Sequence, residues 1–356
     1  MRKINIETKH GSVVTPFFMP DATRGLVKGL SVSDIKQTGI EAICVNTYHL
    51  YLQPGIEVIK KAGGIHAFMG WDGPILSDSG GFQVFSLIHR NKDMGKIYSD
   101  KVVFKSPING ALHELTPEKS IQIQFDLGVD MMVCLDDCPP NDASKKEIDD
   151  AVDHTINWAK RCKQEFEAQI KNRKITVDER PLLFGVIQGG EFLDLRKKCA
   201  EDLIKIGFDG YGYGAMPVDN LGSLLREVLA YTANLIPEDK LRFALGVGKP
   251  EDIIECYKLG WDMFDCVIPT REGRHGRLYK HLNTLVEANL AVENILNAKF
   301  KDDFSVVQDD STIDELRTYS KAYLHHLFKI KDSFGSRLAS LNNLEFYAKL
   351  MKSLRG

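Results

Sequence analysis

Eight short apolar runs, most of them followed by a longer stretch of helical period, constrain the fold of this chain most strongly. The apolar residues of each run are continuous rather than alternating, which is typical of strands buried on both faces. The runs begin at Thr15, Glu41, Pro74, Asp130, Leu182, Phe208, Arg242 and Met263. Amphipathic stretches such as DLRKKCAEDLIKIG separate them. This order predicts an α/β protein with a (β/α)₈ TIM barrel, and a doubly wound sheet is the structural alternative.

The length of the chain fits one barrel-sized unit. It has 356 residues, 43% of them hydrophobic, and we expect residues 1–356 to form a single domain. Two segments interrupt the alternation of strands and helices. Residues 85–118 insert a hairpin after the third strand, with its turn at Pro107–Gly110. Residues 278–316 form a small C-terminal insertion subdomain after the eighth strand, and helical patterns then resume.

Charge and cysteine content narrow the class of protein. The net charge is −3, so a nucleic-acid partner would need a local basic patch. Seven scattered cysteines argue against a disulfide framework. The N-terminus, MRKINIETKHG, has no signal-peptide core, and no apolar run approaches the ~18 residues of a membrane span. We expect a soluble, cytoplasmic protein with no membrane partner.

Acidic and amide side chains follow four of the predicted strands. Asp78 ends the third strand, Asp136 and Asp137 the fourth, Gln188 the fifth and Asp265 the eighth. Chemistry in such barrels belongs at the C-terminal ends of strands, so these groups are candidates for one active site. The alternative is that some of the aspartates cap helices, because aspartate at a strand–helix junction often does so.

Two motifs add binding groups to these acids. In SDSGGFQVFSL, Gly80 and Gly81 bring backbone N–H groups close to a ligand, and Phe82 offers a flat aromatic face. In MFDCVIPTREGRHGR, the basic residues Arg271, Arg274 and Arg277 follow within a few residues of Asp265. Such a cluster supplies affinity for phosphates without requiring a basic protein. Cys134 and Cys138 have no second pair at zinc spacing, which favours structural burial over metal binding.

The order of the motifs is more specific than any one of them. DSGGFQVFSL, VIQGG, GVGKPED and MFDCVIPTREGR, with VNTYHLYLQPG and LTPEKSIQIQ, closely resemble the bacterial tRNA-guanine transglycosylases, the queuine tRNA-ribosyltransferase family. The resemblance runs from about Thr15 to Leu354. It implies a (β/α)₈ barrel that exchanges the wobble guanine of GUN-anticodon tRNAs for a 7-deazaguanine in queuosine biosynthesis or salvage. It also implies a tRNA anticodon loop and a 7-deazaguanine base as partners, and a homodimer.

The resemblance assigns roles residue by residue. Asp265 matches the nucleophile and Asp78 the general acid/base, while Asp136 and Gln188 match groups that read the purine edge and Phe82 the aromatic that stacks on it. The implied substrate-binding set is Ser79, Gly80, Gly81, Phe82, Asp136, Gln188, Ala215 and Met216. The implied RNA-binding set is Gly246, Val247, Gly248, Lys249, Pro250, Glu251, Asp252, Thr270, Arg271, Glu272, Gly273 and Arg274.

The implied chemistry explains why an aspartate stands beside a basic cluster. Breaking a glycosidic bond and making another at the same C1′ is easiest through a covalent ribosyl-enzyme, which needs a carboxylate nucleophile. The target base must leave its stack, so the flanking nucleotides need a grip, which Arg271 and Arg274 would provide.

The chain departs from the family at its zinc site. The three cysteine positions and the histidine position are Ser311, Ile313, Leu316 and Asn342 here. Hydroxyl and apolar side chains are poor zinc ligands beside thiolates, so we expect no metal and no other cofactor. Packing should replace the metal, with Ile313 and Leu316 joined by Tyr319, Tyr323 and Leu327 along one helical stripe.

The loop after the sixth strand also departs from the family pattern. It reads Gly214-Ala215-Met216-Pro217-Val218-Asp219-Asn220, where Pro217 lacks a backbone donor and Asn220 replaces an acid. The tolerated substituent on the deazaguanine therefore stays open. Cys138 is like bacterial members that take the aminomethyl base preQ1, and queuine remains the alternative.

Three functions fit these observations. The first is an active tRNA-guanine transglycosylase. The second is a non-catalytic tRNA-binding partner subunit that has lost its metal, against which the retention of Asp78, Asp136, Gln188 and Asp265 argues. The third is a relative that acts on DNA or on another RNA, which the altered loop keeps open.

Overall fold

The structure, a computed structural model, describes residues 2–280 and 291–356. Its centre is one parallel sheet in which the strands follow the order β3-β13-β12-β11-β10-β9-β5-β4. The strands are β3 (Phe17–Pro20), β4 (Ile43–Asn46), β5 (Ile75–Asp78), β9 (Met131–Val133), β10 (Leu182–Ile187), β11 (Gly210–Tyr213), β12 (Leu241–Ala244) and β13 (Met263–Cys266). These are the eight predicted strands.

The sheet closes on itself. A parallel bridge joins Asp21 to Cys44, and the Ala22 N–H donates to the Cys44 carbonyl at 2.7 Å, so β3 lies beside β4 as well as β13. A doubly wound sheet has two open edges, so the alternative is excluded and the predicted TIM barrel is confirmed.

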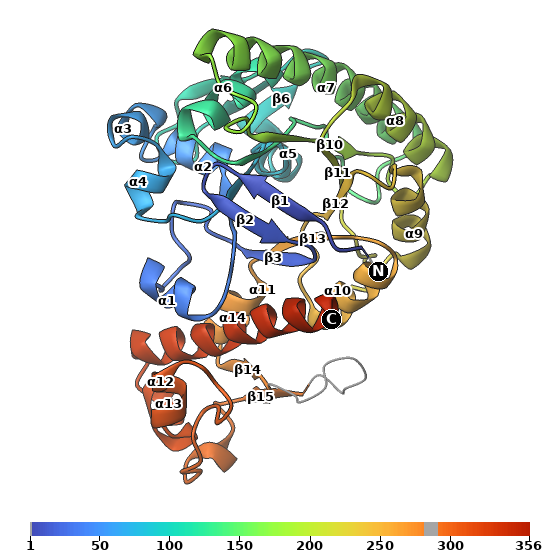
Figure 1. Cartoon of the computed structure of the whole chain (residues 1–356). Helices are drawn as coiled ribbons and strands as arrows, with labels where there is room; N and C mark the ends of the chain where they lie inside the picture. Colours follow the sequence, from blue (N-terminus) through green and yellow to red (C-terminus); the bar gives the residue numbers. More distant parts are fainter. Residues whose placement is uncertain (1, 281–290) are drawn as a thin grey trace.

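Helices alternate with the strands and surround the ring (Figure 1). They are α1 (Val32–Gln37), α2 (Thr47–Leu52), α3 (Ile56–Lys61), α4 (Ile65–Met69), α5 (Gly81–Arg90), α6 (Pro117–Leu127), α7 (Lys145–Arg173), α8 (Leu193–Ile206), α9 (Arg226–Leu235), α10 (Pro250–Lys258) and α11 (Ile268–Arg274). The longest, α7, begins with a capping box in which Ser144 and Glu147 satisfy each other's backbone N–H groups. None of the helices among the described residues is long and apolar enough to cross a membrane.

A hairpin that the sequence did not predict covers the N-terminal end of the barrel. Strands β1 (Asn5–Thr8) and β2 (Gly11–Val14) pair antiparallel and lie across the barrel in Figure 1. Ile6 and Val13 are buried in the same core as inward-facing barrel residues such as Phe17 and Met263. The hairpin therefore closes the floor of the barrel.

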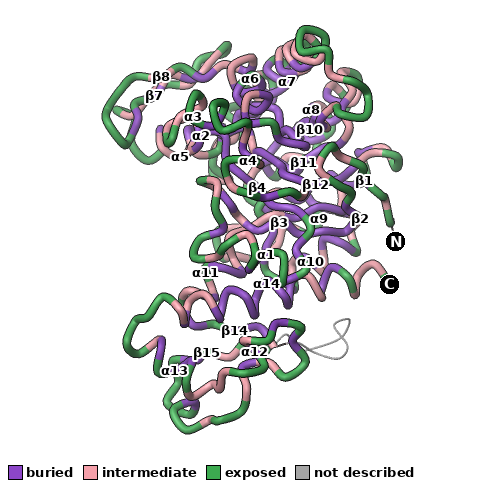
Figure 2. The backbone as a smooth tube through the Cα atoms, turned by 60° about the vertical axis from the view of Figure 1, so that its left-hand side comes forward, coloured by how far each residue is buried: buried purple, intermediate pink, exposed green. Residues whose placement is uncertain are grey.

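The insertion after β5 contains the predicted hairpin and one more strand. Strands β7 (Val102–Lys105) and β8 (Leu112–Leu115) pair antiparallel around the predicted turn, and β6 (Gly95–Ile97), after the turn η1 (Lys92–Met94), pairs with β7. Figure 2 shows β7 and β8 in a lobe beside the barrel. The predicted start at residue 85 was wrong, because α5 continues to Arg90 with Val84, Phe85 and Ile88 buried at helical spacing.

The C-terminal subdomain has a small core of its own. Its elements are β14 (Arg277–Tyr279), β15 (Val292–Asn294), η2 (Ala298–Phe300), α12 (Asp314–Thr318), α13 (Lys321–Lys329) and α14 (Ser333–Arg355). The predicted insertion at 278–316 covers part of it, and residues 281–290 lie outside the described residues. Helix α14 lies between this core and the barrel (Figure 1). It packs so closely on α11 that a Cβ at Gly273 would lie 2.8 Å from Ser340 N.

The packing expected at the former zinc site is confirmed only in part. Ile313, Leu316 and Leu327 are buried in the subdomain core, but Tyr323 is 40% exposed. The single helical stripe was wrong, because α12 ends at Thr318 and α13 begins at Lys321, so a break in the helix separates the residues.

A buried carboxylate holds the same tract in place. Glu345 on α14 accepts from Ser311 Oγ at 2.6 Å, from Thr312 N at 2.7 Å and from Thr312 Oγ1 at 2.9 Å. Asn342, at the histidine position, donates to the Tyr279 carbonyl at 2.9 Å. The side chains at the four positions therefore do not fit a zinc ion.

Candidate active site

The residues predicted for catalysis lie together at the C-terminal ends of the barrel strands. Asp78 is the last residue of β5, Asp265 lies in β13 one residue before its end, and Gln188 directly follows β10. Asp136 follows shortly after the end of β9. None of these aspartates caps a helix, since the N-caps of α5, α7 and α11 are Gly80, Ser144 and Val267. The capping alternative is excluded.

Asp78 lies in a tight turn that brings donors to its carboxylate. Asn46 Nδ2 donates to Oδ2 at 2.6 Å, and the Gly80 N–H donates to Oδ1 at 3.1 Å. Gly80 has a φ of +78°, and a Cβ there would lie 2.8 Å from Tyr48 N, so the turn requires glycine. Burial raises the pKa of Asp78 to about 7, and the charge of Asp265 adds to this effect, while the hydrogen bonds oppose it. Asp78 therefore gains and loses a proton near neutral pH.

Asp265 has one backbone donor. The Gly246 N–H donates to its Oδ1 at 2.9 Å. Burial raises the pKa of Asp265 to about 6; the Gly246 hydrogen bond opposes this rise and the charge of Asp21 adds to it. The pKa of the buried Cys44 thiol is also raised, first by burial and then by Asp265, Asp78 and Asp21. The charges of Asp265, Asp78 and Asp21, at the ends of β13, β5 and β3, therefore all act on one thiol at the barrel mouth.

Asp136 and Gln188 form a direct pair. Gln188 Nε2 donates to Asp136 Oδ2 at 2.7 Å. Burial raises the pKa of Asp136 to about 6 against this hydrogen bond, with a further rise from Asp137. Gln188 Oε1 is buried and has no hydrogen-bond partner among the residues described. A Cβ at Gly214 would lie 2.5 Å from Gln188 Nε2, so a glycine is needed beside this pair. The pair offers both a donor and an acceptor to a flat heterocycle.

Asp137, predicted at the same strand end, does not join this pair. His154 Nδ1 lies 2.9 Å from its Oδ2, and this contact raises the pKa of His154. Of the two neighbouring acids, Asp136 therefore pairs with Gln188, and Asp137 pairs with His154 on α7.

The remaining predicted substrate residues form the rim of the mouth. Phe82 is 50% exposed in the first turn of α5, and Met216 is 46% exposed in the loop after β11. Both line a cavity of about 380 Å³ that Cys138 also lines. The Ser79 hydroxyl accepts from the Gly81 N–H at 3.2 Å, so it supports the turn below Phe82. Ala215 has a φ of +79°, a strained value for alanine.

The predicted RNA-binding segments lie beside one groove. Lys249, Arg271 and Arg277 line a groove of about 450 Å³ together with Glu251 and Glu272. Glu272 pairs with Arg277 at 2.8 Å. The basic side chains of this groove would bind the phosphates of a nucleic acid, and two of them follow Asp265 closely in the chain.

Several other members of the predicted RNA-binding set are buried and support the groove through packing. The side chains of Val247, Pro250 and Thr270 are buried, as is Gly273 against α14. Gly248 is close-packed as well, because a Cβ there would lie 2.2 Å from Cys266 Cβ. Asp252 lies in the first turn of α10, and burial raises its pKa. Burial lowers the pKa of Arg274, which the charge of Asp21 opposes. Contact of these residues with RNA stays a prediction.

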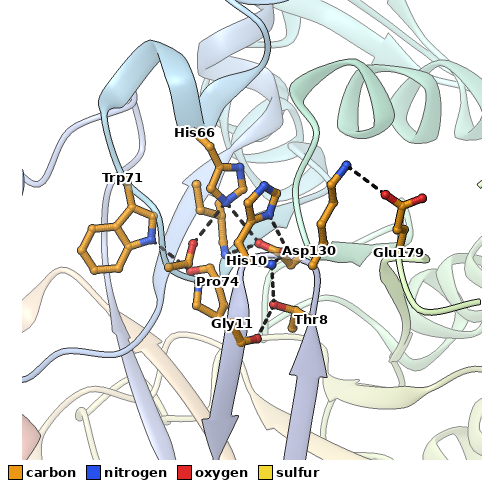
Figure 3. Close-up of polar contacts among 11 residues, drawn as sticks. Thr8, His10, Gly11, His66, Trp71, Pro74, Asp130 and Glu179 are labelled. Carbon is orange, nitrogen blue, oxygen red and sulfur yellow. Dashed lines mark hydrogen bonds and ion pairs between the residues drawn. The ribbon is translucent and has the colours of Figure 1, made fainter.

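At the other end of the barrel, His10, His66 and Asp130 form the cluster of potential metal ligands found in the described part of the chain (Figure 3). His10 Nδ1 lies 2.8 Å from Asp130 Oδ1, and His66 Nε2 lies 3.2 Å from Oδ2 and 3.1 Å from the Gly73 carbonyl. The two imidazoles stack with their centroids 3.5 Å apart. These polar contacts and the ring stack join the β1–β2 hairpin to the barrel floor.

Three residues beside the candidate site were missed in the sequence. Asp21 and Asn46 stand at the ends of strands β3 and β4, so the rule that selected Asp78 could have selected them too. Arg196 gave no signal, because it lies in an amphipathic helix where arginine normally faces solvent. It is fully buried, and it donates to the carbonyls of Ile187, Gly190 and Gly214 at 2.7–2.8 Å. It therefore fixes the strand ends on both sides of Gln188.

Known proteins agree with this arrangement. Residues 1–356 match the family model described as queuine tRNA-ribosyltransferase. Proteins named queuine tRNA-ribosyltransferase from Staphylococcus aureus strains JH9, JH1 and N315 are each 43% identical to the chain over 353 residues. The match covers 98% of this chain and 87% of each relative. With the barrel and its acids, these matches show that the chain belongs to the queuine tRNA-ribosyltransferase family.

Proposed function

We propose that this protein exchanges the wobble guanine of GUN-anticodon tRNAs for a 7-deazaguanine through a covalent ribosyl-aspartate on Asp265. Membership of the family makes it a pentosyltransferase of queuosine biosynthesis that acts on tRNA. The observation that carries the residue assignment is the meeting of Asp265, Asp78 and the Asp136–Gln188 pair at one barrel mouth.

The proposed reaction has two balanced steps. The Asp265 carboxylate attacks C1′ of the ribose, the bond from C1′ to N9 breaks, and guanine leaves with a proton from Asp78. N9 of the incoming base then displaces the carboxylate from C1′ and gives its proton to Asp78, which restores both acids.

The two pKa values suit these roles. A nucleophile must be ionised, and the pKa of Asp265 of about 6 leaves it mostly ionised at neutral pH. An acid that both donates and accepts works best when its pKa lies near the working pH, and that of Asp78 is about 7. The Gly246 N–H holds one oxygen of Asp265, so the other oxygen is available to attack.

The base-reading pair supports a purine substrate. Ionised Asp136 accepts from purine N–H groups, and the Gln188 amide donates to O6. Phe82 on the rim supplies the stacking face. The aminomethyl base preQ1 is the incoming base we favour because of Cys138, and queuine is the alternative.

We also propose that the C-terminal subdomain folds without zinc. Support comes from the Glu345 carboxylate, which binds Ser311 and Thr312 where thiolates would hold a metal, and from buried Ile313 and Leu316. The family's homodimer and a cytoplasmic location stay predictions for this chain. The mass of the protein in solution tests the first of them.

The activity is tested with radiolabelled guanine and an unmodified tRNA with a GUN anticodon. We expect label to enter the tRNA in a reaction that requires the protein. The matched control is the same tRNA with adenine at the wobble position, which should take up no label. Equal labelling of both tRNAs, or labelling of a DNA hairpin of the same sequence, would contradict the proposal and favour the relative that acts on other nucleic acids.

A further inference from the structure

The loop after β11 needs an external support that its own backbone does not give. Its second residue, Ala215, has a φ of +79°, a left-handed conformation that is strained for alanine. Pro217 has no N–H to donate. Further along, the loop is closed by its own hydrogen bonds, from Asp219 N to the Ser223 carbonyl at 2.9 Å and from Leu225 N to the Pro217 carbonyl at 2.9 Å. The stretch from Met216 to Val218 still has three groups, the Met216 N–H and the Met216 and Val218 carbonyls, that are not bonded by the described backbone of the loop.

One amide side chain holds that stretch. Asn141, from the segment between β9 and α7, donates through Nδ2 to the Val218 carbonyl at 3.0 Å and to the Met216 carbonyl at 3.3 Å. Its Oδ1 accepts from the Met216 N–H at 3.3 Å. Asn141 thus binds the peptide groups on both sides of Pro217. It follows Pro139 and Pro140, whose fixed φ angles reduce the freedom of its backbone.

The position of this contact connects it to the base. Asn141, Met216 and Val218 line the same cavity of about 380 Å³ as Phe82 and Cys138. Cys138 lies against the base-reading pair, since its thiol pKa is raised first by burial and then by Asp136, while a hydrogen bond with Gln188 lowers it. In a 7-deazaguanine, C7 and C6, the carbon that bears O6, are both bonded to C5, so a C7 substituent and O6 project from the same edge of the base. A base whose O6 meets Gln188 therefore directs its C7 substituent toward Gly214 and the held loop.

We propose that Asn141 is a positioning residue that sets the Met216–Val218 wall and thereby selects the incoming base by its C7 substituent. This inference rests on the proposed function. Guanine carries no substituent at that position, so the wall matters little for its exchange. The cavity is also lined by Asp142 and Asp219, whose carboxylates suit a short cationic amine, and by His89 and Arg90 farther around its edge. The class of base selected is a 7-deazaguanine with a short aminoalkyl group.

The experiment compares two bases in each variant. Kinetic constants are measured for radiolabelled guanine and for 7-aminomethyl-7-deazaguanine with the same tRNA. In Asn141→Ala we expect the KM of the aminomethyl base to rise roughly 5- to 10-fold, the loss of a few partly exposed hydrogen bonds. The KM of guanine and its kcat should change less than about twofold. Asn141→Asp keeps the acceptor for Met216 N but sets a carboxylate oxygen against the Met216 and Val218 carbonyls, so it should raise the KM of the aminomethyl base at least as much as Asn141→Ala does.

Two outcomes overturn the inference. If both bases lose activity equally in Asn141→Ala and Asn141→Asp, Asn141 only supports the fold. If Asn220→Ala, the same substitution on the same cavity, changes the ratio of the two bases while Asn141→Ala does not, another residue sets the wall. Failure of the proposed function is distinguished from these outcomes, because the wild-type protein would then exchange no guanine at all.

Discussion

The two ends of the barrel treat buried carboxylates in opposite ways. At the floor, burial alone would raise the pKa of Asp130, but hydrogen bonds from His66, the Ile75 N–H and His10 outweigh it and the pKa is lowered. At the mouth, burial dominates, and the pKa values of Asp78 and Asp265 rise to about 7 and about 6. The comparison teaches that burial does not set the role of an acid. The balance between desolvation and the hydrogen bonds that the carboxylate accepts decides whether its pKa rises or falls.

The largest expected effect is at the mouth. Asp265→Asn removes the proposed nucleophile, so base exchange should fall about 10³-fold or more, while tRNA binding persists. Single-turnover exchange and a denaturation-resistant protein–tRNA adduct measure this. An adduct that survives in the variant would move the nucleophile to another acid, with Asp78 the next candidate.

The converse substitution at the floor should affect stability instead. Asp130→Ala leaves His10, His66 and the Ile75 N–H without their acceptor, and breaking such a buried contact costs about 3–5 kcal/mol. The midpoint of urea unfolding measures this loss of stability. The kcat at low temperature tests whether the active site at the mouth is unchanged. Asp72→Ala, which breaks an exposed pair with Lys36, is the matched control and should be nearly silent. A normal midpoint in Asp130→Ala would mean that the floor does not depend on this acid.

The pH dependence of stability sharpens the contrast, because the two ends have opposite signs. Asp78 binds its proton more tightly in the folded state, up to about pH 7, so its contribution to stability falls as pH rises from about 4 to 7. Asp130 has a lowered pKa, so its contribution is complete above its unfolded value of 3.8 and is lost below it. Asp78→Asn should therefore raise the melting temperature by roughly 2–5 °C at pH 8 and much less at pH 5. An equal change at both pH values would show that Asp78 is not desolvated as the structure indicates.

A smaller effect is expected in the groove beside the mouth. Arg271→Ala should weaken tRNA binding a few-fold and lower the slope of log affinity against log salt by about one, because one phosphate contact is lost. Binding is measured by filter retention at several salt concentrations. Lys171→Ala, an exposed cation in the last turn of α7, is the control. A slope that is unchanged in Arg271→Ala would mean that this arginine serves the fold.

The smallest expected effect concerns metal. A strong chelator should change neither the melting temperature nor the exchange rate, because Glu345 binds the tract at the former zinc site and hydrogen bonds account for the His10–His66–Asp130 contacts. Elemental analysis should find far less than one zinc per chain. If the protein holds one zinc per chain and a Glu345→Gln variant still binds that zinc normally, the ion would lie at the His10–His66–Asp130 cluster on the barrel floor. Unfolding by the chelator would place a structural metal in the molecule.

The parts of the fold that the sequence predicted well are those encoded by local patterns. Strands buried on both faces are continuous apolar runs, so all eight could be found. The β1–β2 hairpin was missed because each strand has only four residues and buries only one of them, Ile6 or Val13. The predicted helical stripe through Tyr323 was wrong because the break between α12 and α13 at residues 319–320 cannot be seen from the spacing of apolar residues alone.

The same division holds for the active site. The sequence by itself determined which acids stand at strand ends, because a barrel brings all those ends to one mouth. Only the tertiary structure decided the pKa values of these acids, since a pKa depends on donors that lie far away in the chain, such as Asn46 for Asp78 and Gly246 for Asp265. It also decided that Arg196 is buried and that Asn141 holds the Met216 loop, contacts that span 18 and 75 residues. The physical reason is that desolvation and hydrogen-bond geometry arise from neighbours in space, which no local pattern records.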